Sequence, residues 1–322
     1  MLRVLTSGFG FVILLTVLMI LAYWDPAVGT RGGWLYHSLL SEFLVGLIFL
    51  IQGFRLNLKN LSFFFRQPVG GFALQAGIIF LPVLWVKIFW AVGILPDNLY
   101  SPFFFLAILP TTISSCVVFT ASGQGNADYS LGHATLSNVL ALFLVPALWA
   151  GSYNGRGAFD ILVPKIIALV ILPFLAGWLL SKLFSRIARG IEGKWHEQIP
   201  MLCIAFLVYL SLCEGITQIG ENRFLSEVKL ILPYCLGFVI LLHLSGWMFS
   251  IRWSKSRDIQ IAQFFCLSQK SLASGLPLAT IVFFGNTEEL MGVSLPLFCV
   301  HFLQLLLGSS LLMSLKGRVE SQ

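Results

Sequence analysis

Long apolar runs recur along the whole chain, and they limit its fold more strongly than any other feature. About ten such runs, each of about 20 residues, alternate with short segments that carry charge, proline or glycine. A helix needs about 20 apolar residues to cross a bilayer core about 30 Å thick, so each run predicts a transmembrane helix. Because 57% of the residues are hydrophobic and only 11% are charged, a water-soluble fold is excluded. The predicted spans lie near 8–24, 35–54, 70–94, 101–121, 130–151, 161–184, 199–217, 229–251, 260–284 and 290–314.

The basic residues between these runs predict the orientation of an all-α integral membrane protein. With a cytoplasmic N-terminus, thirteen Lys and Arg face the cytoplasm and five face the outside, as short basic loops do. We therefore predict cytoplasmic chain ends in a plasma or bacterial inner membrane. Since the net charge of +6 is spread over loops, the lipid bilayer is a predicted partner and nucleic acid is not. The cytoplasmic set is Arg3, Arg55, Lys59, Arg66, Lys182, Arg186, Arg189, Lys194, Arg252, Lys255, Arg257, Lys316 and Arg318, and the outer set is Arg31, Arg156, Lys165, Arg223 and Lys229.

The cysteines do not follow the pattern of a metal site or a disulfide framework. All six lie within or beside apolar runs, without the paired spacing of zinc ligands. We interpret them as reduced packing residues, and we predict no cofactor other than a coupling ion. They are Cys116, Cys203, Cys213, Cys235, Cys266 and Cys299.

Two spans carry residues that interrupt helices. In span 4, Pro110 is followed within five residues by four hydroxyl side chains, and in span 9 the stretch 268–277 combines Lys270 with an amide, serines, a glycine and a proline. Unwound backbone at membrane depth is tolerated where it lines a cavity or is buried in protein, so such breaks point to a transporter binding site. The candidate residues are Thr111, Thr112, Ser114, Ser115, Cys116, Gln269, Lys270, Ser271 and Ser274.

The positions of the breaks predict an inverted repeat. They fall in the fourth helix of residues 1–155 (spans 1–5) and in the fourth helix of residues 156–322 (spans 6–10). An odd number of helices per half makes the second half enter the membrane from the opposite face. Half-helix ends then meet near the midplane, with positive ends for anions and free carbonyls for cations. A span 4 that is only kinked, with Ser and Thr bonded to their own helix, is the alternative.

Neighbouring spans carry polar side chains at helical spacing. Such faces predict side chains that point inward toward the breaks. Hydrogen bonding between packed helices, without a binding role, is the alternative for each residue. These residues are Gln75 in span 3, Ser130, His133, Ser137 and Asn138 in span 5, and His301 and Gln304 in span 10.

Lys270 is the most unusual single residue. Inserting a lysine at the centre of a transmembrane helix costs about 2.5–3.5 kcal/mol of free energy on insertion scales. A lysine at this position therefore implies an interaction partner, a polar cavity or a functional role. Its own span contains no carboxylate, and the acidic residues nearest to membrane depth are Glu42 in span 2 and Glu214 in span 7. A structural ion pair with one of them is the alternative to a functional role. Lys87, near the outer end of span 3, is expected to extend toward the interface.

Several short stretches keep one order over most of the chain. They are 49–56, Gln75, 110–116, Gly125-Asn126-Ala127, 265–277, Pro296-Leu297, His301 to Gln304 and Gly308-Ser309. Together they resemble the bile acid:sodium symporter superfamily, and within it the branch of solute carrier family 10 member 7 and its bacterial relatives. The resemblance implies a panel domain of spans 1, 2, 6 and 7 and a core domain of spans 3, 4, 5, 8, 9 and 10. It also implies that the broken spans 4 and 9 cross in the core.

The resemblance further implies a sodium site behind the crossing. Carried over by position, its ligands fall on Ser115 and Cys116, on Ser130 and Ala134, and on Gln75 and Gln269. The acidic ligand falls near Phe265 or Cys266, where this chain has no carboxylate. Sodium is a hard cation that prefers oxygen ligands, so this departure and the nearby ammonium weaken a site near Ser115, Ser130 and Gln269.

Three roles for Lys270 follow as hypotheses. Its ammonium takes the electrostatic place of one sodium ion, it titrates as part of proton coupling, or it attracts the anionic head of a substrate. Na⁺ and H⁺ are therefore the two candidate coupling ions. If replacing Lys270 with alanine left transport and its ion dependence unchanged, all three roles would be wrong.

Other function classes fit the sequence less well than transport. The chain contains no HExxH, no acidic metal cluster and no GxSxG, so we predict that it is not an enzyme. A channel favours a filter repeated around a symmetric assembly rather than one pair of broken helices. We predict a secondary active transporter that moves a small organic solute, anionic or amphipathic, by alternating access. A non-transporting regulator of calcium homeostasis and a proton-coupled or uncoupled carrier are the alternatives.

Overall fold

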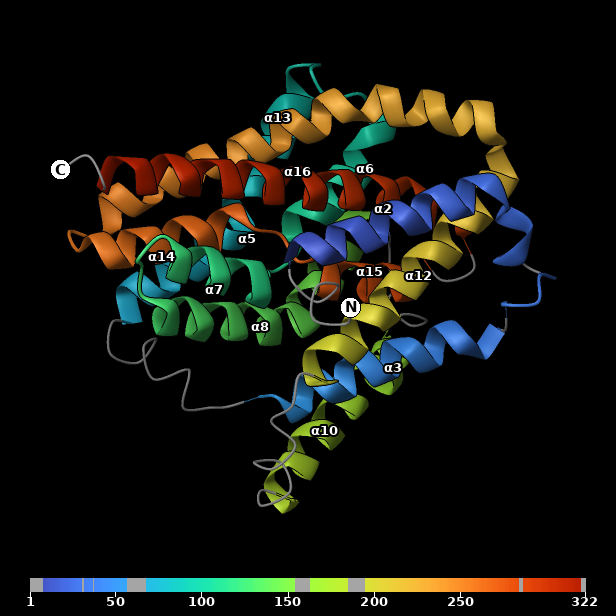
Figure 1. Cartoon of the computed structure of the whole chain (residues 1–322), viewed down its shortest axis with the longest axis horizontal. Helices are drawn as coiled ribbons and strands as arrows, with labels where there is room; N and C mark the ends of the chain where they lie inside the picture. Colours follow the sequence, from blue (N-terminus) through green and yellow to red (C-terminus); the bar gives the residue numbers. More distant parts are fainter. Residues whose placement is uncertain are drawn as a thin grey trace. The chain divides into compact units, whose positions relative to one another are not determined.

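Helices form the regular structure of this protein (Figure 1). The computed structural model describes residues 8–30, 32–36, 38–56, 68–153, 163–184, 195–283 and 286–319. Within these ranges six helices are long and apolar enough to cross a membrane, and four shorter apolar helices have 10–17 residues. Val69 and Leu183 are 73% and 68% exposed, as suits side chains that contact lipid. The predicted all-α, multi-pass integral membrane protein is confirmed, whereas the ten-helix inverted repeat stays a prediction.

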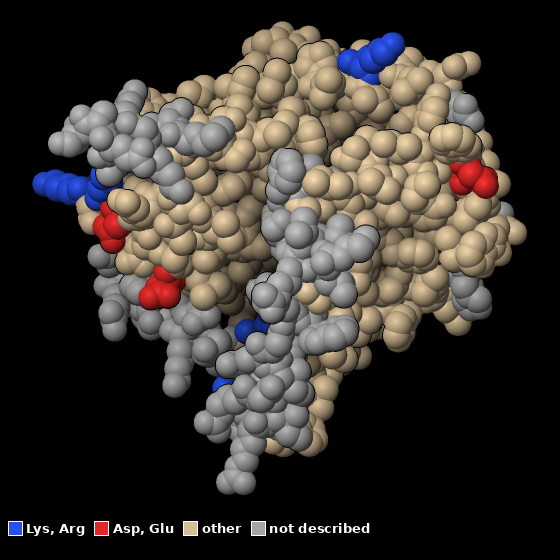
Figure 2. Space-filling view, viewed as in Figure 1, with Lys and Arg blue, Asp and Glu red and all other residues tan. Residues whose placement is uncertain are grey.

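Charged side chains are sparse on the face drawn in Figure 2. Over the described part of that face, uncharged residues make up most of the surface, and basic and acidic side chains form small isolated groups. Such a surface suits burial among lipid chains. The orientation of the chain ends stays a prediction. Of the basic residues on which it rests, Arg3, Arg31, Lys59, Arg66, Arg156, Arg186, Arg189 and Lys194 lie outside the described residues.

The chain forms two compact units. Unit 1 contains Met1–Leu56, Pro146–Val228 and Leu276–Leu295, and unit 2 contains Asn57–Val145, Lys229–Gly275 and Pro296–Gln322. All sixteen candidate site residues belong to unit 2. The assignment of spans to a panel and a core domain stays a prediction.

Close helix contact through glycine is the main packing feature of unit 1. The helices α3 (Ser38–Phe54) and α10 (Leu172–Leu183) lie side by side (Figure 1). A Cβ atom on Gly53 would lie 1.9 Å from the carbonyl oxygen of Phe174, and one on Gly177 would lie 1.9 Å from that of Leu50. The two backbones therefore approach so closely that each helix needs glycine at the contact. Unit 1 also contains α2 (Gly8–Trp24), η1 (Pro26–Val28), the π-helical turn η3 (Ile167–Ile171) and α12 (Trp195–Ile219).

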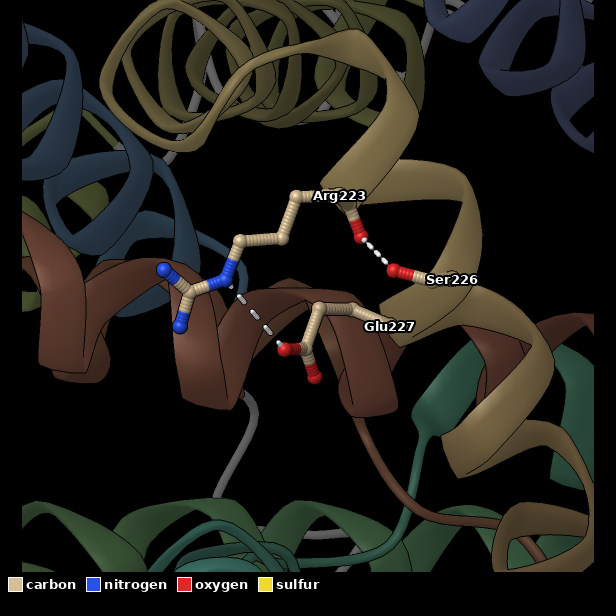
Figure 3. Close-up of polar contacts among 3 residues, drawn as sticks. All are labelled: Arg223, Ser226 and Glu227. Carbon is tan, nitrogen blue, oxygen red and sulfur yellow. Dashed lines mark hydrogen bonds and ion pairs between the residues drawn. The ribbon is translucent and has the colours of Figure 1, made fainter.

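The segment between α12 and α13 differs from the sequence prediction. Residues before 229 are expected to form an external loop, but α13 (Glu221–Trp253) already begins at Glu221, directly after Gly220, whose φ of +81° ends α12. Figure 3 shows this first part of α13, where Ser226 donates to the carbonyl oxygen of Arg223. Arg223 Nε lies 3.8 Å from Glu227 Oε1, with side chains 66% and 34% exposed. An exposed pair of this kind contributes little to stability.

Two interrupted helices lie in unit 2, where the sequence predicts the breaks. The first pair is α6 (Asp97–Ile108) and α7 (Ile113–Ser122), and the second is α14 (Arg257–Ser268) and α15 (Leu272–Val282), which belongs to unit 1 from Leu276 onward. Figure 1 shows α7 beside α14, and side chains of α7 hydrogen-bond to Ser130 of α8. The continuous helices that contribute to unit 2 are α5 (Pro68–Ala91), α8 (Ala127–Tyr153), α13 and α16 (Thr287–Val319).

Candidate functional site

The two helix breaks hydrogen-bond to each other. Thr112 N donates to the carbonyl oxygen of Gln269 over 3.1 Å, and Ser271 N donates to that of Pro110 over 2.9 Å. These bonds make a single antiparallel β-bridge between Thr111 and Lys270. Because both breaks lie at buried positions, the bridge supplies backbone partners that the helices no longer provide. The predicted breaks are therefore joined, and the polar residues around them form one cluster.

Proline explains the first break. Pro110 lacks a backbone N–H and disfavours helical geometry in the residue before it. Leu109 accordingly has extended backbone angles, with φ −67° and ψ 150°, and so does Thr112, with φ −78° and ψ 135°. In the second break Gln269 is extended, with φ −114° and ψ 105°.

Gln304 of α16 hydrogen-bonds to the backbone of the second break. Its side-chain Oε1 accepts from Lys270 N over 2.8 Å, and its Nε2 donates to the carbonyl oxygen of Lys270 over 2.8 Å. The amide thus satisfies both backbone groups of one unwound residue, as a neighbouring strand would. Gln304 Nε2 also lies 2.9 Å from His301 Nδ1, which places the two predicted polar residues of this helix together.

Asn138 of α8 braces the first break and connects it to the second. Its Nδ2 donates to the carbonyl oxygen of Thr111 over 2.8 Å, and its Oδ1 accepts from Ser274 Oγ over 2.5 Å. Ser137 Oγ accepts from Thr111 N over 3.3 Å. Ser271 Oγ in turn accepts from Ser274 N over 3.2 Å, at the first turn of α15. The polar face predicted for span 5 thus contacts both breaks.

Gln75 and His133 form a second contact that the sequence does not predict as a pair. Gln75 Nε2 donates to the carbonyl oxygen of His133 over 3.0 Å and lies 3.2 Å from His133 Nδ1. Ser115, by contrast, reaches the second break, where its Oγ donates to Gln269 Oε1 over 3.2 Å. Gln75 and Gln269, both sodium ligands by resemblance, have protein partners in this arrangement.

Two thiols occupy the region where the resemblance implies sodium ligands. Cys116 Sγ lies 3.5 Å from Cys266 Sγ and 3.0 Å from Ser130 Oγ. Thr120 Oγ1 donates to Ser130 Oγ over 3.2 Å and completes the cluster. All six cysteines are free, as predicted. Sulfur is a poor ligand for a hard cation, so these residues do not offer the oxygen-rich set that sodium prefers.

Lys270 reaches backbone carbonyls rather than a carboxylate. Its Nζ donates to the carbonyl oxygens of Ile78, Ala107 and Leu109 over 2.7, 2.8 and 2.8 Å. The residue is 1% exposed, and its three ammonium donors are matched by three acceptors. The ion pair with Glu42 or Glu214, one of the alternatives drawn from the sequence, is therefore not needed to satisfy the ammonium.

Exposure divides the sixteen candidate residues into two groups. Ser114 is exposed and Asn138 is partly exposed. The other fourteen are buried, and several of them hydrogen-bond to the breaks. The buried set is Gln75, Thr111, Thr112, Ser115, Cys116, Ser130, His133, Ser137, Gln269, Lys270, Ser271, Ser274, His301 and Gln304.

Two residues of the cluster are absent from the sequence prediction. Pro82 in α5 lies four residues after Ile78 and so removes the helical donor to the Ile78 carbonyl oxygen, which Lys270 then occupies. The proline itself is a visible signal for this role. Thr120 lies one turn after Cys116 on α7, which is the signal that could have added it to the polar face.

Apolar helices around a hydrogen-bonded junction of two interrupted helices are features of membrane transport proteins. Comparison with known families agrees with this class. The chain belongs to the SBF-like CPA transporter family, whose model matches residues 10–317. The resemblance to bile acid:sodium symporters is thereby confirmed, and membership of a transporter family favours transport over catalysis.

Several known proteins are similar to the chain over nearly their whole length. One is "Putative symporter YfeH" of Escherichia coli strain K12, 28% identical over 96% of this chain and 93% of the relative. Another is "Sodium/bile acid cotransporter 7" of Danio rerio, 25% identical over 95% of this chain and 93% of the relative. A third, "Uncharacterized protein PA2026" of Pseudomonas aeruginosa, is 27% identical over 94% of this chain and 91% of the relative.

Proposed function

We propose that this protein is a secondary transporter that moves a small organic anion, amphipathic in character, by alternating access. The observation that carries the proposal is the junction of the two helix breaks, held by hydrogen bonds between Thr112 and Gln269 and between Ser271 and Pro110. Interrupted helices that meet within a membrane protein bring helix ends, with their partial charges, to a solute. The name "Sodium/bile acid cotransporter 7" of one relative supports the same class of cargo, and "Putative symporter YfeH" supports transport.

The N-terminal end of α7 supports an anionic cargo. The helix begins at Ile113, and the side chain of its N-cap residue Thr112 does not cap a backbone amide of the first turn, because its Oγ1 lies 3.5 Å from Ser114 Oγ instead. The first amides of such a helix, with the positive end of its dipole, favour negative charge. Ser114 in this turn is exposed, and Asn138 nearby is partly exposed. The anionic group is proposed to bind at this first turn, with the apolar part of the solute beside it.

Lys270 supports a mechanism without sodium. Three roles were considered for its ammonium, and replacement of a bound cation fits the contacts best. All three of its N–H donors bond to backbone carbonyls. An ammonium held in this way is not free to bind the head of a substrate. We therefore propose that the junction is assembled without a sodium ion, and that the carrier is uncoupled or is coupled to protons.

Replacing Ser114 with aspartate is expected to reduce transport of an organic anion by more than about tenfold while leaving the fold intact. Asp in the first turn of a helix favours the helix, so stability is preserved, but its charge repels an anion from that end. The measurement is counterflow of labelled taurocholate and estrone sulfate in liposomes containing the purified protein. Counterflow requires a carrier and needs no coupling ion.

Ser226 provides the matched control for this charge change. It is an exposed serine in the first part of α13, outside the candidate site (Figure 3). Ser226→Asp is expected to keep the counterflow of the unchanged protein. If both probes fail to show counterflow with a folded protein, the organic-anion proposal is wrong and a regulatory role is favoured. An ion current far above carrier turnover would indicate a channel.

A further inference from the structure

The three carbonyls around Lys270 Nζ are not engaged in the usual helical hydrogen bonds. The carbonyl of Ile78 would accept from residue 82 in α5, but this residue is Pro82, which has no N–H. The carbonyl of Ala107 would accept from Thr111 N, which instead donates to Ser137 Oγ. Leu109 lies beyond the end of α6, in the first break. A proline and a helix end together leave three acceptors directed at one point.

The electrostatics at this point favour a cation. The C-terminal end of a helix carries partial negative charge, and two of the three carbonyls lie at the end of α6. Rings of backbone carbonyls replace the hydration shell of monovalent cations in membrane proteins. The described contacts of this cage contain no carboxylate, so they lack the anionic ligands that divalent cations usually require.

We propose that the carbonyls of Ile78, Ala107 and Leu109 form a binding site for a monovalent cation of the ammonium class, which Lys270 fills with its own side chain. The contact distances of 2.7–2.8 Å suit N–H donors and the larger alkali cations better than sodium. This inference rests on contacts within unit 2 and does not depend on which solute is transported. It predicts that removing the side chain exposes a site for an external cation.

The test compares two variants of Lys270 by thermal unfolding of the purified protein in salts of equal ionic strength. Lys270→Ala removes three methylene groups and the ammonium, so n-propylammonium replaces the missing atoms. Lys270→Met keeps an apolar chain in the same space and leaves no room for the amine. We expect both variants to unfold at lower temperature than the unchanged protein. Only Lys270→Ala should recover several degrees in n-propylammonium, with smaller gains in methylammonium and potassium than in n-propylammonium.

Two results would overturn the proposal. One is a Lys270→Ala variant that responds to the amine no more than Lys270→Met or the unchanged protein does.

If Lys270→Ala does not fold, the unchanged protein supplies the second test through reductive methylation and mass spectrometry. Lys270 should stay unmodified under conditions that methylate the exposed Lys255, because its nitrogen is held by three acceptors. Equal modification of both lysines would contradict an occupied cage. A failure of counterflow would leave both results unaffected.

Discussion

Gln304→Met is expected to lower the free energy of unfolding by about 2–6 kcal/mol, because it leaves both backbone groups of Lys270 without partners. Each buried polar group that loses its hydrogen bond costs about 1–3 kcal/mol, and methionine fills a similar volume without replacing either bond. The lost bonds are those from Lys270 N to Gln304 Oε1 and from Gln304 Nε2 to the Lys270 carbonyl. Thermal or chemical unfolding of the purified protein measures the effect.

Two further variants separate this effect from a general loss of glutamine. Gln304→Glu keeps an acceptor for Lys270 N but loses the Nε2 donor. Its stability should therefore lie between that of the unchanged protein and that of Gln304→Met. Gln218→Met changes an exposed glutamine in α12 and should alter stability by less than about 0.5 kcal/mol. Equal losses for Gln304→Met and Gln218→Met would show that the amide does not hold the break.

Gly177→Ala should destabilise unit 1 by about 1–3 kcal/mol or more, because its Cβ would lie 1.9 Å from the carbonyl oxygen of Leu50. That atom belongs to the backbone of α3, so relief of the clash requires the two helices to separate. The same argument applies to Gly53 against Phe174. The measurement is again the unfolding transition, together with the yield of folded protein.

Gly237 in α13 gives the control for this substitution. A Cβ added there meets no atom within 4 Å, so Gly237→Ala introduces no clash. Alanine favours a helix over glycine by about 1 kcal/mol, and stability should therefore be unchanged or slightly raised. A Gly177→Ala protein as stable as Gly237→Ala would show that α3 and α10 do not pack as closely as described.

The sequence was most informative where local chemistry decides the structure. Pro110 and the run from Gln269 to Gly275 predict both helix breaks, because they remove backbone donors or favour unwound backbone. The polar spacing of Asn138 and Gln304 likewise predicts that their side chains face inward. The start of α13 at Glu221 was missed, because charged residues at a membrane boundary resemble a loop in composition even when they continue a helix.

The roles of the buried residues depended on contacts between distant parts of the chain. Lys270 was recognised as unusual, but its acceptors come from α5 and from the end of α6, and backbone carbonyls leave no mark in a sequence. Pro82 was the one sequence feature that indicated an unpaired helical carbonyl, that of Ile78, near the lysine. Cys116 and Cys266 lie 150 residues apart, so their contact could not be read from spacing. Many of the candidate residues hydrogen-bond to the breaks, and a sequence pattern cannot distinguish such contacts from binding.

The most direct test of the central claim, a helix junction assembled without sodium, is the melting temperature of the unchanged protein in sodium, lithium, potassium and choline chloride at equal ionic strength. The ammonium of Lys270 already occupies a carbonyl cage, and thiols lie where sodium ligands are implied, so no sodium-dependent stabilisation should occur. We expect the same melting temperature in all four salts. A rise that is specific to sodium and saturates with its concentration would contradict the account.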